Sequence, residues 1–393
     1  MLPLKFKCNN IAVHGYHGYQ NTGDDLFCYI GAAAAKKYWG TEQVAFLTPQ
    51  SIVLPEDIEY RRPPIEYMRK RLPRPMFKVQ WFANATLMSM WADKIVYLGG
   101  SIFHSAPQGL DIRRVHNILG RLSQSKLAAV GISLGPFQSE ADYQWIKSFL
   151  SKFSYIAFRD KKSYEIALKM RLPGKLVQAF DLAGLLPDME EGYFAKNAVS
   201  EKKLRFYRLG VSICHYERFT GKNLSIETRR EEKLLETLKR LAQKQDMEIC
   251  FFVFNGHSSY GDTTITHHFA EELSPFAKIK IYGYDPNPIA VWYKIRTCNG
   301  FVGVRLHSGI LAYMAEIPFS LIEYHPKCTE FLDYVGYPDS LKLSGHFSES
   351  EETVAILEKV LFDTPYNQLV KLDTKTAYEL ARLNFTSAPW FTQ

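Results

Sequence analysis

The sequence of 393 residues lacks several features that would assign it to a well-marked class of protein. It has no run of apolar residues approaching the roughly 20 that cross a membrane. Its first residues lack the apolar core and small-residue cleavage site of a secretory leader, and no Cys-x-x-Cys pair occurs anywhere. We therefore expect a cytoplasmic protein without a spanning helix.

The cysteines are few and scattered, at Cys8, Cys28, Cys214, Cys250, Cys298 and Cys328. Most have apolar neighbours, which favours reduced and buried thiols. None stands with histidines at the spacing of zinc ligands, so no metal site is expected. Apolar residues make up 46% and charged residues 23% of the sequence, as in an ordinary globular protein. A chain of this length usually forms two domains rather than one core.

Positive charge is concentrated in one short segment, although the net charge of the whole chain is only +7. Residues 61–82 hold the basic and aromatic side chains Arg61, Arg62, Tyr67, Arg69, Lys70, Arg71, Arg74, Phe77, Lys78, Trp81 and Phe82. This mixture suits peripheral contact with an anionic membrane surface, such as the inner membrane. A solvated loop followed by an amphipathic helix is the alternative. No nucleic-acid motif accompanies the segment, so nucleic acid is not an expected partner.

Short apolar runs alternate with helix-length segments in the first half of the chain. The runs of strand length are residues 10–14, 43–47, 94–98, 127–133, 155–159 and 176–180. Continuous apolar strands separated by helices indicate a parallel sheet covered on both faces. We predict an N-terminal Rossmann-like domain over residues 1–187, which includes the basic segment 61–82.

The alternation stops after Pro187 and then resumes. Residues 188–207 are polar and without period, which predicts a linker. Further strands are expected at residues 208–214, 248–254, 278–283, 300–304 and 318–324. They define a C-terminal Rossmann-like domain over residues 208–349, followed by C-terminal helices over 350–393. The predicted fold is α/β, with two doubly wound domains facing a cleft and ligands at the carboxyl ends of the strands.

The first strand ends in a glycine-rich loop, residues 15–25, that leads into a helix near Thr22 or Asp24. Glycine lets the main chain approach a ligand, and the amides of a helix N-terminus favour anions. The loop matches neither G-x-G-x-x-G nor the Walker A motif. The acidic pair Asp24-Asp25 can act as a general base toward sugar hydroxyls. A capped helix start without a ligand explains the loop equally well.

Two glycine turns and an arginine follow later strands of the first domain. We expect turns at residues 99–101 and 131–136, where glycine permits close approach of a ligand or of a packed helix. Arg159 closes its strand, and Ser163 is the expected cap of the next helix. The planar guanidinium of Arg159 suits a carboxylate or phosphate. A structural pair with Asp160 is the alternative.

The sharpest local signal in the second domain is the pair Arg305 and His307, which lies between a buried strand and a helix for which Ser308 is the expected cap. A fixed cation and a titratable imidazole at a helix N-terminus favour an anion site, although a hydrogen-bonded structural histidine is the alternative. The next strand delivers Lys327 to the same sheet edge, where it can neutralise a phosphate.

These motifs occur in a fixed order: Asn21-Thr22-Gly23-Asp24-Asp25, Gly99-Gly100-Ser101, Gly131-Ile132-Ser133-Leu134-Gly135-Pro136, Arg159-Asp160-Lys161-Lys162-Ser163, Asp181-Leu182-Ala183 and Arg305-Leu306-His307-Ser308. The set resembles the polysaccharide pyruvyl transferase family over residues 10–335. Asp25 stands where that family more often has glutamate.

The resemblance implies a fold similar to the GT-B glycosyltransferases and transfer of pyruvate from phosphoenolpyruvate, as a ketal, to two hydroxyls of a sugar such as galactose. The acceptor would be a surface-polysaccharide precursor, for instance an oligosaccharide linked to polyprenyl diphosphate. By the same resemblance, His307, Arg305 and Asp25 are expected to serve catalysis. The other positions expected to bind substrate are Arg159, Lys327, Leu306, Ser308, Asn21, Gly100 and Ser101. No cofactor or metal is required, because arginine and lysine can neutralise the leaving phosphate.

Two other functions remain compatible with the sequence. A GT-B glycosyltransferase would use a nucleotide sugar bound to its second domain. A non-catalytic saccharide-binding scaffold would have no turnover to lose when Arg305 and His307 are changed. Fold alone does not decide between these functions, because one fold supports many reactions.

Overall fold

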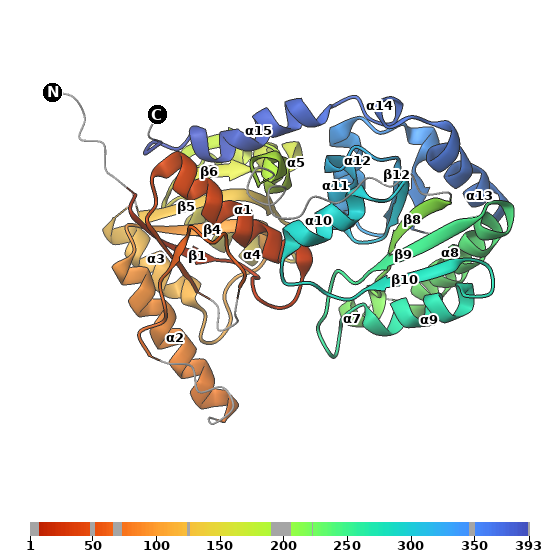
Figure 1. The fold of residues 1–393 in the computed structure, drawn as a ribbon. Coiled ribbons are helices and arrows are strands. Elements are labelled where there is room, and N and C mark those ends of the chain that lie inside the picture. Colours follow the sequence, from red (N-terminus) through yellow and green to blue (C-terminus); the bar gives the residue numbers. More distant parts are fainter. Residues whose placement is uncertain are drawn as a thin grey trace. The chain divides into compact units, whose positions relative to one another are not determined.

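The chain folds into two compact units in the computed structural model (Figure 1). The structure describes residues 8–47, 52–65, 73–123, 126–189, 206–221, 223–345 and 350–391. Unit 1 comprises Met1–Tyr19, Phe27–Leu185 and Ala377–Gln393, and unit 2 comprises Gln20–Leu26 and Leu186–Thr376. The segment Gln20–Leu26, which includes the first residues of the helix that follows the glycine-rich loop, thus groups with unit 2, although the residues before and after it belong to unit 1.

Unit 1 is built on a parallel sheet with the strand order β3-β2-β1-β4-β5-β6-β7. The strands are β1 Asn10–His14, β2 Gln43–Phe46, β3 Glu59–Tyr60, β4 Lys94–Phe103, β5 Leu127–Leu134, β6 Phe153–Phe158 and β7 Lys175–Gln178. The central strands are buried along most of their length, as their continuous apolar sequences require. The order of the strands reverses between β1 and β4, which confirms the predicted doubly wound arrangement.

Helices cover this sheet in the pattern expected of such a domain. They are α1 Thr22–Trp39, α2 Arg74–Trp91, α3 Ile112–Leu122, α4 Glu140–Leu150, α5 Lys161–Met170 and α15 Thr374–Thr386, with the 3₁₀ helix η2 Leu182–Met189 after β7. Helices α2 and α3 share one core cluster with β1 and β2, and α4 and α5 pack on β4, β5 and β6. Helix α15 packs on α1, because the indole nitrogen of Trp39 donates to the Phe385 carbonyl at 2.9 Å.

The glycine segments 99–101 and 131–136 differ from the predicted turns. Strand β4 continues to Phe103, and its register against β5 shifts between Gly100 and Phe103. Gly99, Gly100 and Gly131 all have positive φ and lie inside strands. A bulge absorbs such residues without ending the strand. A Cβ on Gly99 would lie 2.2 Å from the ring of Phe27, so packing explains this glycine.

Unit 2 repeats the same plan with the strand order β10-β9-β8-β11-β12-β13. Its strands are β8 Tyr207–Ser212, β9 Met247–Phe252, β10 Lys278–Tyr282, β11 Gly300–Gly303, β12 Phe319–Glu323 and β13 Leu343–Ser344. The pairings are parallel. Strands β8, β9, β11 and β12 therefore end at one edge, which we call the carboxyl edge of unit 2.

The helices of unit 2 are α7 Glu217–Thr220, α8 Leu224–Lys244, α9 Thr263–Leu273, α10 Pro288–Arg296, α11 Leu306–Met314, α12 Pro326–Val335, α13 Ser350–Glu358 and α14 Tyr366–Leu369, with the short turns η3 Asp339–Leu341 and η4 Lys359–Asp363. Helices α8, α9 and α13 bury apolar residues against β8 and β9. Apolar positions three and four apart on α8, such as Leu234, Leu238 and Leu241, form the buried stripe that its sequence predicts.

Two helix caps differ from prediction. Asp160, not Ser163, caps α5, because its carboxylate accepts from the Ser163 amide at 2.7 Å. Helix α11 begins at Leu306, so Ser308 lies inside the first turn and donates to the Arg305 carbonyl at 2.6 Å. Aspartate is a strong cap, and a serine within a helix commonly bonds to a carbonyl of the preceding turn.

The segment 350–393 was predicted as one C-terminal part. It is divided between the two units, with the boundary between Thr376 and Ala377. Most of the predicted linker, residues 190–205, lies outside the described residues. Residues 66–72 of the basic segment also lie outside them, including Tyr67, Arg69, Lys70 and Arg71. All six cysteines are buried and unbridged, as predicted.

No helix in the described part of the chain combines the length and the hydropathy that crossing a bilayer requires.

Candidate active site

The glycine loop is attached to the end of β9 by main-chain hydrogen bonds within unit 2. Asn21 forms an antiparallel bridge with Asn255. The Thr22 amide donates to the Phe254 carbonyl at 2.9 Å, and the Gly256 amide donates to the Gln20 carbonyl at 2.8 Å. Helix α1 begins at Thr22, as the sequence predicts. The loop is therefore held in place at the carboxyl edge of unit 2.

Gly23 brings the main chain of this loop directly against His307. A Cβ at position 23 would lie 2.0 Å from Nδ1 of the His307 imidazole and 2.4 Å from its Cγ. Real Cβ atoms do not approach other atoms so closely, so glycine is the residue that allows this imidazole position. His307 is the second residue of α11 and is half-buried. The loop and the predicted catalytic histidine thus belong to one site.

Arg305 is held by a buried aspartate that sequence analysis did not single out. Its Nε donates to Oδ2 of Asp262 at 2.6 Å, and its Nη2 donates to Oδ1 at 2.5 Å. Asp262 also accepts the Asn255 amide at 2.9 Å. This two-point contact fixes the plane of the guanidinium and leaves Nη1 as the nitrogen that can contact a further anion.

The electrostatics keep Arg305 charged. Burial disfavours the cation, but the Asp262 carboxylate more than offsets that effect and raises the pKa of Arg305 above its ordinary value. Removing the carboxylate would leave a buried charge without compensation.

Lys327 adds a second positive charge at the same edge. It lies in the first turn of α12, where its amide donates to Nδ1 of the capping residue His325 at 3.2 Å. Arg305 follows β11 and Lys327 follows β12, and these strands are neighbours in the sheet, so both residues lie at the same part of the carboxyl edge.

Asp25 is buried and accepts a hydrogen bond at 2.6 Å from the hydroxyl of Tyr284. Burial and the neighbouring Asp25 carboxylate raise the pKa of Tyr284, so its phenol stays protonated and keeps donating. This contact orients the carboxylate and uses one of its lone pairs. As an anion, the Asp25 carboxylate can accept a proton from a hydroxyl group.

The other predicted substrate-binding residues of unit 2 take different positions. The Asn21 side chain accepts the Gly23 amide at 3.1 Å and so shapes the loop. Leu306 and Ser308 are buried. The Ser308 amide donates to the Arg305 carbonyl at 3.0 Å, so main-chain contact with an anion at these two positions would come from the Leu306 amide at the start of α11.

Arg159, Gly100 and Ser101 lie in unit 1. The Arg159 side chain is buried; its Nη1 bonds Asp181 at 2.8 Å and its Nε donates to Ser133 Oγ at 2.8 Å. The ion pair considered in the sequence therefore exists, but with Asp181 instead of Asp160. Substrate binding by Arg159, Gly100 and Ser101 stays a prediction.

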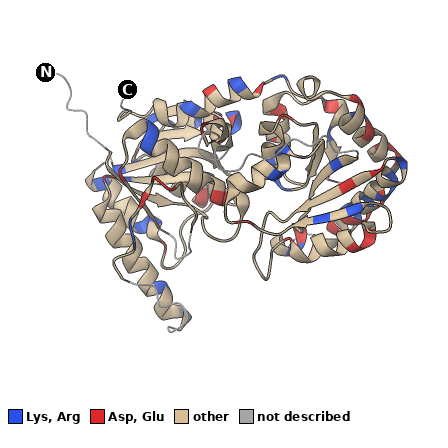
Figure 2. Cartoon of the chain, viewed as in Figure 1, with Lys and Arg blue, Asp and Glu red and all other residues tan. Residues whose placement is uncertain are grey.

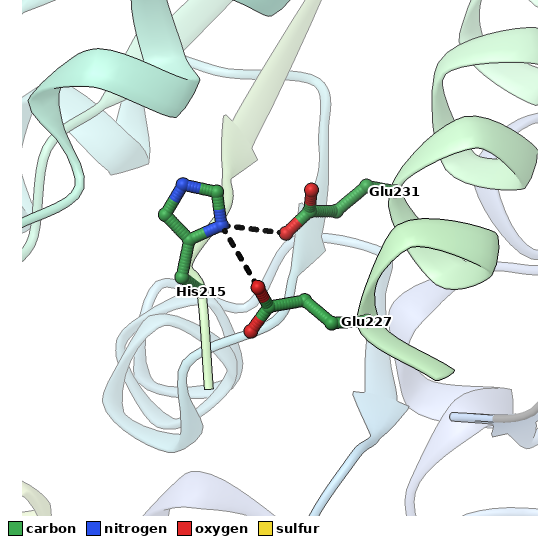
Figure 3. A group of neighbouring side chains, drawn as sticks. All are labelled: His215, Glu227 and Glu231. Carbon is green, nitrogen blue, oxygen red and sulfur yellow. Dashed lines mark hydrogen bonds and ion pairs between the residues drawn. The ribbon is translucent and has the colours of Figure 1, made fainter. Parts of the chain in front are cut away.

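A cluster with metal-ligand residue types joins His215, just after β8, to Glu227 and Glu231 of α8 (Figure 3). His215 Nδ1 lies 2.7 Å from Glu231 and 3.5 Å from Glu227. The Glu227 oxygen nearest His215 also accepts from Nε of Arg218 at 2.5 Å. A metal ion bound to this oxygen would lie beside the arginine charge. The donor set therefore fits an ion-pair network better than a metal centre.

Sequence reasoning missed three residues that contact the candidate site, namely Asn255, Asp262 and Tyr284. Asn255 and Asp262 both follow β9, and Tyr284 follows β10. The rule that polar residues after parallel strands meet at one edge could have identified them, because it identified Arg305 and Lys327 in the same way.

Comparison with known proteins first identifies the fold. The structure is similar to UDP-GlcNAc 2-epimerase of Neisseria meningitidis bound to UDP-GlcNAc, with a TM-score of 0.59, 10% identity, and coverage of 95% of this chain and 97% of that chain. It is also similar to UDP-GlcNAc 2-epimerase of Methanocaldococcus jannaschii, with a TM-score of 0.58, 12% identity, and coverage of 95% and 98%. These likenesses confirm the predicted two-domain, GT-B-like α/β fold.

A curated relative is the amylovoran biosynthesis protein AmsJ of Erwinia amylovora, which is 21% identical over 264 residues. The match covers 63% of this chain and 60% of that protein, less than two thirds of its length. The family model for polysaccharide pyruvyl transferases matches residues 21–326, which include the loop at Asn21, the pair Arg305 and His307, and the first residue of α12. The chain therefore belongs to the polysaccharide pyruvyl transferase family.

Proposed function

We propose that this protein transfers pyruvate from phosphoenolpyruvate, as a ketal, onto two hydroxyl groups of a sugar in a polysaccharide precursor. The observation that carries the proposal is the group of Arg305, His307 and Lys327 at the carboxyl edge of unit 2. Family membership supports the reaction class. The choice of phosphoenolpyruvate is supported by the charges at this edge.

Phosphoenolpyruvate carries a carboxylate and a phosphate on a small frame, so a site for it needs fixed cations. Arg305 is fixed by Asp262 through two short hydrogen bonds. In the proposed site it binds one anionic group through Nη1, and Lys327 neutralises the other as a point charge. Prior ordering of the guanidinium reduces the entropy lost when the donor binds. No further cofactor is needed in this scheme.

His307 is proposed as the acid. It protonates the methylene carbon of the donor, which becomes a methyl group and leaves an oxocarbenium-like centre at the carbon that bears phosphate. One sugar hydroxyl attacks that carbon, phosphate departs, and a second hydroxyl closes the ketal. The protons of the two hydroxyls pass to the phosphate and to a base. Imidazole suits the first step, because it exchanges protons near neutral pH.

Asp25 is proposed as the base toward the acceptor hydroxyl. Its hydrogen bond with Tyr284 fixes one carboxylate oxygen and orients the other. The proposed acceptor is a saccharide linked to polyprenyl diphosphate, with galactose as a possible sugar. This acceptor would place the reaction at a membrane surface.

The test is phosphate release from phosphoenolpyruvate with and without a nitrophenyl galactoside or a lipid-linked saccharide, with the product mass followed in the same samples. We expect acceptor-dependent release and a product heavier by one pyruvate ketal. Consumption of a nucleotide sugar, with no phosphate released across several acceptors, would instead identify a glycosyltransferase. Parallel reactions with EDTA test the absence of a metal, and activity should be unchanged.

A further inference from the structure

Helix α2 carries an apolar stripe on the side that faces away from its own core. Met76, Val79, Leu87 and Met90 are exposed by 56%, 57%, 45% and 62%. Together with Ala83 they recur at intervals of three and four residues, so they lie along one side of the helix. The opposite side of α2 packs on unit 1 through Ala85 and Met88. The exposed residues therefore form a continuous stripe along the helix, in addition to its buried face.

Helix α3 adds to this surface. It packs against α2, where Ser89 Oγ lies 2.9 Å from Nε2 of His116. Its residue Ile112 shares the core cluster that holds Ala85 and Met88, so both helices cover the same face of the sheet. Ile118 and Leu122 of α3 are exposed by 58% and 79%. We call the exposed residues of the two helices the α2/α3 surface.

The charge of this surface has one sign. Neither α2 nor α3 contains an aspartate or glutamate, and Figure 2 shows no acidic residue along α2. Exposed basic residues on the two helices are Lys78, Arg114 and Arg121. Single exposed apolar residues are common, but an apolar stripe on a pair of helices whose exposed charges are all positive is not a typical solvent-facing surface. Its chemistry is complementary to an apolar layer covered by negative charges.

We propose that the α2/α3 surface docks on an anionic lipid membrane. The apolar stripe would enter the region between headgroups and acyl chains, while Lys78, Arg114 and Arg121 would contact lipid phosphates. This interaction does not depend on the chemistry proposed for unit 2. Specific binding to a protein partner uses a pattern of charges that complements the partner's own charges. Binding to anionic lipid headgroups requires only net positive charge on the α2/α3 surface, which is what this surface carries.

Co-sedimentation with vesicles tests the proposal with the full-length protein. The parent should sediment with vesicles of phosphatidylcholine and phosphatidylglycerol, and much less with phosphatidylcholine alone. The double variant Val79→Glu, Leu87→Glu should lower the partition coefficient between vesicles and water by roughly tenfold or more. It removes two apolar side chains that would be buried in the membrane, and it adds two negative charges that anionic lipid repels. The matched control is Leu168→Glu on α5, which is exposed by 51% and lies outside this surface.

Further measurements separate the proposal from its alternatives. Phosphate release with a soluble acceptor should be the same for the parent and the double variant. Equal vesicle binding by the double variant and the Leu168→Glu control would overturn the proposal. The proposal would also be overturned if the parent protein did not sediment with anionic vesicles. Sedimentation velocity without lipid should show the same mass for parent and double variant; a dimer that dissociates in the double variant would identify a second copy as the occupant.

Discussion

The two sheets share the same order of their first six strands, but the polar side chains close to them differ in kind. In unit 1, His116 is buried and bonds the Tyr97 hydroxyl at 2.7 Å, and the ring of the half-buried His14 lies 5.7 Å from that of His116. In unit 2, Arg305 pairs with Asp262 at the carboxyl edge, and Arg230 of α8 pairs with Glu217 of α7. Unit 1 also holds charged pairs, such as Arg159 with Asp181 and Arg113 with Asp111.

This difference shows that topology alone does not select the site. Both sheets reverse their strand order and could bind ligands at that point. The fixed cation, the titratable imidazole and the glycine loop all belong to unit 2. In the proposed function the donor therefore binds at the second sheet, and the proposal can be tested by changes that affect one unit and not the other.

The largest effect is expected from His307→Ala. Loss of a general acid typically lowers turnover by about 10² to 10⁴-fold, while the half-buried position should leave the fold intact. His268→Ala, on the exposed side of α9, is the matched control and should retain parent activity. Turnover of His307→Ala within a few-fold of the parent would remove this histidine from the mechanism.

Gly23→Ala should displace the His307 imidazole, because Gly23 lies directly against it. Its Cβ would overlap the His307 ring, so the ring or the loop must move. A displacement of about 1 Å can lower turnover by around 10²-fold. Gly283→Ala is the control, because a Cβ there meets nothing within 4 Å. Equal turnover of the two variants would show that the contact between loop and histidine has no catalytic importance.

Asp262→Ala and Asp181→Ala compare one buried pair in each unit. Each change leaves an arginine uncompensated and should lower the free energy of unfolding by about 3 to 5 kcal/mol. Only Asp262→Ala should also weaken phosphoenolpyruvate binding, because Arg305 loses its fixed orientation. Urea unfolding and calorimetric titration provide the two measurements. Weaker binding in Asp181→Ala as well would indicate that Arg159 also serves the donor.

Mild acid should destabilise unit 1 before unit 2. Burial lowers the pKa of His14 to about 4, with Asp111 opposing and Arg113 reinforcing that shift. The unfolded chain binds this proton near pH 6.5, so stability should fall between about pH 6.5 and 4, by up to about 3 kcal/mol. In unit 2, burial opposes but arginine pairing lowers the pKa of Glu217 and Glu227, so their contribution is lost only below about pH 4.5.

Hydrogen exchange, corrected for the intrinsic rate at each pH, measures this difference. Protection of β1 and β4 should decrease between pH 7 and 5, while β8 and β9 change less. His14→Phe should reduce the pH dependence in unit 1. Equal loss of protection in both units would contradict the assignment.

The sequence predicted the sheets well because buried parallel strands are continuous apolar runs. Residues 10–14 form β1 as predicted, and most of the other predicted strands agree within a few residues at their ends. Strand β4 continues to Phe103, beyond the predicted 94–98, and the short edge strands β3 and β13 were not predicted. The bulges in β4 and β5 were missed, because Gly99 and Gly131 are typical of turns when pairing to neighbouring strands is unknown. Arg305, His307 and Lys327 were located by their positions after strands. Asp262 also follows a strand, but its particular role could not be predicted, because it comes from a contact with Arg305, 43 residues away in the sequence.

The most direct test of the central claim is calorimetric titration of phosphoenolpyruvate into the parent and into Lys327→Gln and Lys359→Gln. Lys359 is an exposed lysine of unit 2 in η4, and this segment contacts Tyr207 at the beginning of β8, away from the carboxyl edge. The account predicts affinity about tenfold weaker for Lys327→Gln and unchanged for Lys359→Gln. Equal affinities for the parent and both variants would contradict donor binding at the carboxyl edge of unit 2.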